Sequence, residues 1–106
     1  MDLNEYQREA RKTAVYPPLM GLIYSVLGLS GEAGELANKL KKTIRDGSEG
    51  RPTQSDIAAE LGDVLWYVSA VADNLGFSLE EIATSNLTKL RLREENGTLK
   101  GSGDER

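Results

Sequence analysis

Residues 57–75 form the most regular stretch of the chain and constrain its fold more than any other feature. Apolar side chains recur there at intervals of three and four residues, as they do along one face of an α-helix. This apolar stripe consists of Ile57, Leu61, Val64, Leu65, Val68, Val71, Ala72 and Leu75. The strict alternation that is typical of a half-buried strand occurs nowhere in the sequence. The pattern therefore predicts an all-α protein.

Helices are also expected at the two ends of the chain. A capping box at residues 2–5 begins a first helix that runs to about Val15, where the Tyr16-Pro-Pro sequence ends it. A second capping box at residues 78–81 begins a last helix that runs to about Glu95. The expected core face of this last helix consists of Leu79, Ile82, Ala83, Leu87 and Leu90.

Another helix is expected to begin near residues 19–20 and to end at the Asp-Gly pair of residues 46–47. It contains glycine at every third position from 28 to 34, and each costs up to about 1 kcal/mol relative to alanine if helical. Two interpretations stay open: a continuous helix in which glycine permits a close approach, or a loop at residues 28–31 between two shorter helices. The exposed loop that follows is expected to end at an N-cap, Thr53 or Ser55.

Two acidic pairs, Glu32 with Glu35 and Glu60 with Asp63, have the spacing that places both members on one face of a helix. Such pairs are common on solvated helices. However, Glu60 and Asp63 lie beside the apolar stripe, where unpaired carboxylates are costly to desolvate. Four carboxylates brought together would repel one another unless cations neutralised them. The motif therefore predicts a site for a hard divalent cation, Mg²⁺ first, with Mn²⁺ as a substitute and Ca²⁺ also open, against the alternative of an ordinary solvated surface.

The composition excludes several kinds of chemistry. The chain has no cysteine and no histidine, which removes thiol nucleophiles, imidazole bases and the usual zinc ligands. A net charge of −4 argues against a basic nucleic-acid-binding surface, and no apolar run is long enough to cross a membrane. We expect a cytoplasmic location by default. A chain of 106 residues that folds as four helices cannot bury all of their apolar faces within one protomer, so we also expect a homo-oligomer.

Polar and aromatic residues near these motifs are candidates for substrate contact. Asn86, Lys89 and Arg93 lie on one face of the last helix, where the two cations are spaced to contact phosphate oxygens. The alternative is a solvated basic face. Tyr67, one turn beyond Asp63, is placed to reach a ligand. We interpret Trp66 as a core or interface packing residue, against the alternative of a base-stacking platform. Gln7 and Tyr16 are further residues able to reach a nucleobase.

The chain resembles the MazG-like nucleotide pyrophosphohydrolases of the all-α NTP pyrophosphatase superfamily. The resemblance rests on Glu-x-x-Glu at residues 32–35, Glu-x-x-Asp at residues 60–63 with the Val-Leu-Trp-Tyr that follows, the Asn86, Lys89 and Arg93 spacing, and Gly-Ser-Gly-Asp at residues 101–104. It covers nearly the whole chain. It implies a four-helix protomer that assembles as a homodimer or dimer of dimers, with active sites near subunit interfaces.

The resemblance also implies Mg²⁺-dependent cleavage of a nucleoside triphosphate between its α- and β-phosphates. Carried over, Glu32, Glu35, Glu60 and Asp63 are the catalytic metal ligands. Lys89 and Arg93 contact phosphates, and Asn86 and Tyr67 contact the substrate. We expect a catalytic domain at residues 1–96 and a Gly-rich polar tail at 97–106, whose composition favours disorder. The alternatives are a pyrophosphohydrolase for phosphoribosyl-ATP or an alarmone, and a non-catalytic helical regulatory module.

Overall fold

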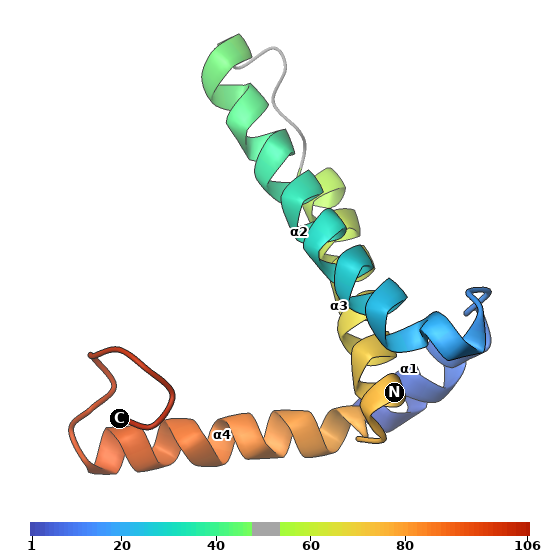
Figure 1. Ribbon diagram of the computed structural model, residues 1–106. Coiled ribbons are helices and arrows are strands. Elements are labelled where there is room, and N and C mark those ends of the chain that lie inside the picture. The colour runs from blue at the N-terminus through green and yellow to red at the C-terminus, as the bar shows by residue number, and fades with distance from the viewer. Residues whose placement is uncertain (48–53) are drawn as a thin grey trace.

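The chain is described by a computed structural model of residues 1–106, in which residues 1–47 and 54–106 are placed. Four α-helices and one short 3-10 helix make up the regular structure of these residues, which contain no strand. The elements are α1 (Leu3–Arg11), η1 (Pro18–Met20), α2 (Gly21–Asp46), α3 (Gln54–Leu75) and α4 (Leu79–Glu95) (Figure 1). The predicted all-α fold class is confirmed.

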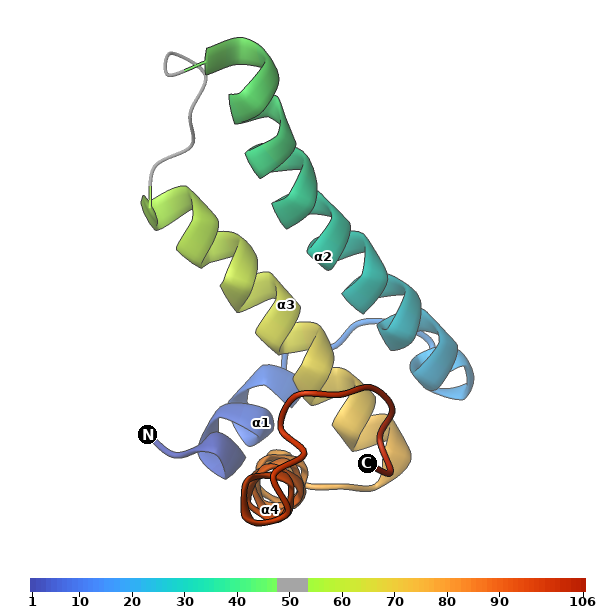
Figure 2. The same ribbon diagram turned by 90° about the vertical axis from the view of Figure 1, so that its left-hand side faces the viewer.

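Helices α2 and α3 lie side by side as an antiparallel pair, and α1 packs near the carboxyl end of α3 (Figure 1). Helix α4 projects away from this pair, and both views show that it does not return alongside α2 (Figures 1 and 2). The C-terminal residues fold back over the distal part of α4 (Figure 1). The protomer is therefore an open arrangement of helices and not a closed four-helix bundle.

Side-chain caps set the beginnings of the first and last helices, as predicted. Asp2 accepts a hydrogen bond from the Glu5 amide at 2.8 Å, and Ser78 with Glu81 forms a complete capping box. The first helix ends at Arg11, four residues before the expected end. Beyond it, the amides of residues 12–14 donate hydrogen bonds to carbonyls three residues earlier, as in a 3-10 turn. The expected end at Val15 was therefore wrong.

Helix α2 is continuous through its glycines, which decides between the two interpretations left open by the sequence. A Cβ atom on Gly28 would collide with the ring of Tyr67, so glycine there permits the close approach of α3. Gly31 has no described atom within 4 Å of the corresponding position. At the far end of the pair, Ser55 lies inside α3 and is not its N-cap, whereas Thr53 lies outside the described residues.

Polar contacts join α1 to the junction of α3 and α4. Gln7 is buried, donates to Asp73 at 2.9 Å and to the Phe77 carbonyl at 3.0 Å, and accepts from the Leu79 amide at 2.8 Å. Arg11 forms an ion pair with Asp73 at 2.6 Å. Gln7 is thus a structural link between helices, and its predicted availability for a nucleobase is wrong for this conformation.

Few apolar side chains are buried within one protomer. Among the described residues the buried hydrophobic ones are Ala70, Ala72 and Leu79. Of the core face predicted for α4, only Leu79 is buried, whereas Leu87 is half exposed. Beyond Leu79, the apolar face of α4 therefore lacks a partner among the described residues. None of the described helices is long and apolar enough to cross a membrane; the cytoplasmic location stays a prediction.

Candidate active site

Three carboxylates meet where α2 and α3 pack together. Glu32 on α2 and Glu60 and Asp63 on α3 each offer one oxygen, and these oxygens lie within 4.8 Å of one another. The one-turn spacing places Glu60 and Asp63 on the same face of α3, and Gly28 lets the two helices approach closely nearby. We call Glu32, Glu60 and Asp63 the acidic cluster.

Glu60 is the most confined member of the acidic cluster, with a side chain that is 14% exposed. Its Oε1 atom lies 2.8 Å from the ammonium of Lys39, one helical turn beyond Glu35 on α2. Its Oε2 atom is buried and has no hydrogen-bond partner among the residues that the structure describes. A buried carboxylate oxygen without a partner is costly, so this atom favours an additional cation.

The electrostatics of the acidic cluster also favour an additional cation. The pKa of Glu32 is raised above its usual value by burial first, and then by the charges of Asp63 and Glu60. Lys39 has a raised pKa because its ammonium is bonded to Glu60. One ammonium near three carboxylates leaves an excess of negative charge, which a divalent cation would neutralise.

The donor set fits a hard cation. All candidate ligands are carboxylate oxygens, the ligand type preferred by Mg²⁺ and Mn²⁺, and the unpartnered Glu60 Oε2 provides a coordinating atom. Glu35, the remaining acid of the predicted set, is exposed and is not part of the cluster in the protomer. Its charge nevertheless contributes to raising the pKa of Glu32.

Two aromatic side chains of α3 stand beside the acidic cluster. The pKa of Tyr67 is raised by burial, then by neighbouring Tyr24, with smaller contributions from Glu32 and Asp63. Trp66 contacts Tyr67 edge to face, with ring centroids 5.0 Å apart. The structure thus places Tyr67 next to the acids, as the sequence predicted.

The predicted phosphate-binding residues lie elsewhere in the protomer. Asn86, Lys89 and Arg93 are carried by α4, which points away from the helix pair that holds the acidic cluster (Figure 1). Lys89 and Arg93 instead contact Asp104 of the tail, at 3.0 Å and 3.2 Å. The protomer therefore brings together three of the four predicted acids and Tyr67, but not the residues of α4.

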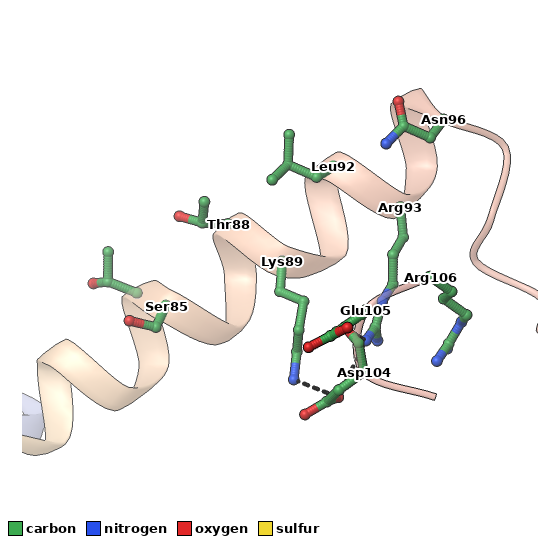
Figure 3. A pocket seen from close by; sticks show the side chains of 10 residues that line it. Ser85, Thr88, Lys89, Leu92, Arg93, Asn96, Asp104, Glu105 and Arg106 are labelled. Atoms are coloured by element: carbon green, nitrogen blue, oxygen red, sulfur yellow. Dashed lines mark hydrogen bonds and ion pairs between the residues drawn. The ribbon is translucent and has the colours of Figure 1, made fainter. Parts of the chain in front are cut away.

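A separate open pocket of about 490 Å³ lies between the tail and α4 (Figure 3). Arg93 is buried beneath it and donates to the carbonyl of Asp104 at 2.9 Å, while Arg106 donates to the carbonyl of Thr98 at 3.0 Å. The Arg93 bond holds the tail against α4 and the Arg106 bond closes the tail on itself, whereas composition favoured disorder. The two guanidinium groups supply the contacts that Gly-rich sequence alone does not reveal.

Comparison with known proteins assigns the family. A model of the MazG nucleotide pyrophosphohydrolase domain matches residues 24–98, well over half of the chain. The chain belongs to the MazG family. The match covers both acidic pairs and the cationic face of α4, and it confirms the resemblance drawn from the sequence.

Relatives of this MazG protein agree with the assignment. It is 45% identical to the Gene 37 protein of Mycobacterium phage L5, and the match covers 100% of both chains. The crystal structure of iMazG from Vibrio DAT 722 is similar in fold, with a TM-score of 0.61 and 32% identity. That match covers 90% of this chain and 97% of the iMazG chain. The protein is accordingly a hydrolase that acts on nucleotide phosphoanhydrides.

Two contacts of this MazG site were not found by sequence reasoning. Lys39 belongs to none of the motifs that the sequence indicated, yet it forms an ion pair with Glu60. Thr13 carries no recognisable motif, yet its hydroxyl accepts a hydrogen bond from Trp66 at 2.8 Å. The i,i+4 spacing of Glu35 and Lys39 would have predicted an ion pair within α2, and it gives no signal for the contact across to α3. The second depends on the turn after α1, which the sequence did not predict.

Proposed function

We propose that the enzyme cleaves a nucleoside triphosphate between its α- and β-phosphates, with Mg²⁺, releasing a nucleoside monophosphate and pyrophosphate. The observation that carries the proposal is the acidic cluster, in which oxygens of Glu32, Glu60 and Asp63 lie within 4.8 Å and Glu60 Oε2 is buried without a partner. Family membership supports a phosphoanhydride as the bond that is broken.

The acidic cluster would hold the metal, and Glu35 would join it if its exposed side chain turned toward the ion. Mg²⁺ held there, or Mn²⁺ in its place, would supply positive charge that offsets the phosphate charge and would make the attacking water more acidic. Water attacks phosphorus in line, the α–β anhydride bond breaks, and pyrophosphate leaves with the bond electrons. Because the chain has no histidine or cysteine, a carboxylate of the motif accepts the proton of the attacking water.

We further propose that the complete site requires a second copy of the chain. Lys89, Arg93 and Asn86 would contact the phosphates and sugar of a nucleotide held by another protomer's acidic cluster. Support comes from the projection of α4 away from its own helix pair (Figures 1 and 2) and from the exposure of its apolar residues Ile82, Leu87 and Leu90. A homodimer, or a dimer of such dimers, would bury that face and bring the cations to the acids.

The test is a turnover panel. Purified enzyme is mixed with each common NTP and dNTP, with Mg²⁺, Mn²⁺ or chelator, and the products are separated by chromatography. Monophosphate and pyrophosphate, formed only with metal and lost in Glu60→Gln, are the expected result. Glu9→Gln, an exposed acid on α1, is the control and should retain turnover.

Other products would change the assignment in defined ways. Diphosphate with orthophosphate would mean that a different anhydride bond is broken. If no common triphosphate is turned over, phosphoribosyl-ATP and alarmone nucleotides are tested next, since these nucleotides also contain phosphoanhydride bonds. Failure of all of them would favour the non-catalytic regulatory module.

A further inference from the structure

A second cavity adjoins the acidic cluster and is not accounted for by metal binding. It has a volume of about 280 Å³ and is lined by Thr13, Glu32, Asp63, Trp66 and Tyr67. Two members of the acidic cluster thus form one side of the cavity, and two aromatic rings form another. The volume is close to the lower end for small-molecule sites, roughly 300 Å³, which suits one portion of a nucleotide and not the whole molecule.

The indole ring of Trp66 is held in place from several directions. Its Nε1 atom donates to Thr13 Oγ1 at 2.8 Å. Its ring meets Tyr67 edge to face at 5.0 Å and 78°, and meets Tyr16 at 6.4 Å and 84°. These partners come from α3 itself and from the segment after α1. A ring fixed before the ligand arrives loses little conformational entropy on binding, which favours its use as a binding surface.

The hydrogen bonds around Trp66 leave few polar groups free to form hydrogen bonds with a base. Thr13 donates its hydroxyl proton to the Ala10 carbonyl at 2.7 Å and accepts from the indole, so it has no donor left for a ligand. The indole N–H is used as well. The aromatic wall therefore offers apolar ring surface beside carboxylates that are placed to hold metal and phosphate.

We propose that Trp66 is a nucleobase-contacting residue, against which the base of the nucleotide packs while its phosphates lie at the acidic cluster. This inference rests on the proposed function and adds the surface that receives the base. Base–aromatic contact tolerates any base, because every base has a flat π-face. We accordingly infer that Trp66 contributes affinity for nucleotides in general, and that Thr13 is a positioning residue that holds the indole.

A purely structural role for Trp66 makes a different prediction. Under that role the ring would only fill space between α1 and α3, and a ligand at the acidic cluster would not alter its surroundings. Trp66 is only partly buried and lines the cavity, so it is accessible to a ligand. It is also the single tryptophan of the chain, which makes its emission a report on this position alone.

The first experiment titrates the full-length enzyme, in Mg²⁺, with an α,β-methylene deoxynucleoside triphosphate that resists cleavage. Tryptophan is excited selectively and its emission is recorded. Inorganic tripolyphosphate with Mg²⁺ is the control, because it has the phosphates but no base. We expect the nucleotide to quench or shift the emission in a saturable manner and tripolyphosphate to change it little.

Each outcome separates this inference from the proposed function. No emission change at nucleotide concentrations that inhibit turnover overturns the base contact and leaves the reaction intact. An equal change with tripolyphosphate also overturns it, because the response would then need no base. A nucleotide-specific change without turnover of any triphosphate supports the base contact and overturns the proposed reaction.

Variants provide a second readout that a structural role would not move. Trp66→Leu is expected to raise KM for triphosphates about 10-fold, a typical loss for one base–aromatic contact, with kcat less affected. Inhibition by tripolyphosphate should stay unchanged. Trp66→Phe keeps a ring and should recover part of the affinity, and Thr13→Val should give a smaller rise in KM. A parallel loss of tripolyphosphate binding in the folded variants would overturn the inference.

Discussion

The ammonium of Lys39 lies 2.8 Å from Glu60 Oε1, while the other oxygen of the same carboxylate is buried and has no partner among the described residues. Lys39 thus neutralises part of the acidic cluster when no metal is bound. It sits four residues beyond Glu35 on the same helix and reaches across to α3. The metal ligand and its internal counter-charge are therefore held by opposite members of the helix pair.

Replacing Lys39 should make the fold more dependent on metal. We predict that Lys39→Met lowers the melting temperature of the metal-free protein, because Glu60 loses its cation, and enlarges the rise on adding Mg²⁺. Differential scanning fluorimetry over a range of Mg²⁺ concentrations measures both quantities. Lys41→Met, at an exposed position two residues on, is the control. Equal metal responses in the two variants would contradict the prediction.

The raised pKa of Glu32 predicts how the stability of the metal-free protein varies with pH. Burial and the charges of Asp63 and Glu60 raise this pKa above the usual 4.5, so the folded state binds the proton more tightly than the unfolded state. The resulting stabilisation is fully present below about pH 4.5 and is lost as pH rises through the folded-state pKa. We expect denaturant melts of Glu32→Gln to lack this contribution. Saturating Mg²⁺ should remove it from the wild type as well, since the metal favours the ionised form.

The sequence was sufficient to predict the features that depend on the spacing of residues within one helix. The caps of the first and last helices and the pairing of Glu60 with Asp63 follow from contacts three or four residues apart, and the structure contains them. Of the predicted apolar stripe of α3, Ala72 is buried, whereas Leu61, Leu65 and Leu75 stay exposed in the protomer. Contacts between distant segments were not predictable in this way. Thr13 meets Trp66 only because α1 ends early and its following turn crosses α3. The spacing of residues along α4 likewise does not reveal that this helix points away from the helix pair that holds the acidic cluster of the same protomer (Figure 1).

Replacing glycine by alanine is expected to have opposite effects on protein stability at two positions of α2. Gly28→Ala should destabilise the protein by about 1–3 kcal/mol, because the added Cβ collides with the Tyr67 ring and the helix pair must separate. Gly31→Ala meets no described atom and should stabilise α2 by up to about 1 kcal/mol through helix propensity. Chemical denaturation of both variants measures the difference. Destabilisation by Gly31→Ala would show instead that a second copy packs closely against this face.

The contact of Asp104 with Lys89 and Arg93 predicts an effect on substrate affinity. A carboxylate at the two cations competes with phosphate for them, and the cations in turn lower the pKa of Asp104, with Lys89 contributing most. Asp104→Asn should lower KM for a triphosphate by up to about fivefold, the scale of an exposed ion pair, with kcat little changed. Glu105→Gln is the control. A rise in KM would mean that Asp104 holds Lys89 in a useful position.

Subunit mixing tests whether the acids and the cations of one site come from different chains. Glu60→Gln and Lys89→Ala should each inactivate the enzyme in isolation, the first through the metal site and the second through phosphate binding. When the two variants are unfolded together and refolded, a mixed dimer contains one site with Glu60 from one chain and Lys89 from the other, both intact. Random pairing makes half the dimers mixed, with one active site in each, so about a quarter of wild-type activity should return.

The outcome of mixing depends on where α4 lies in the assembly. If α4 swung back to its own acidic cluster, every site in a mixed dimer would carry one of the two substitutions and no activity would return. Tagged variants and size-exclusion chromatography with light scattering would show that mixed dimers had formed, so that a negative result is decisive. The open path of α4 in the protomer, which leaves Leu87 half exposed, favours recovery of activity.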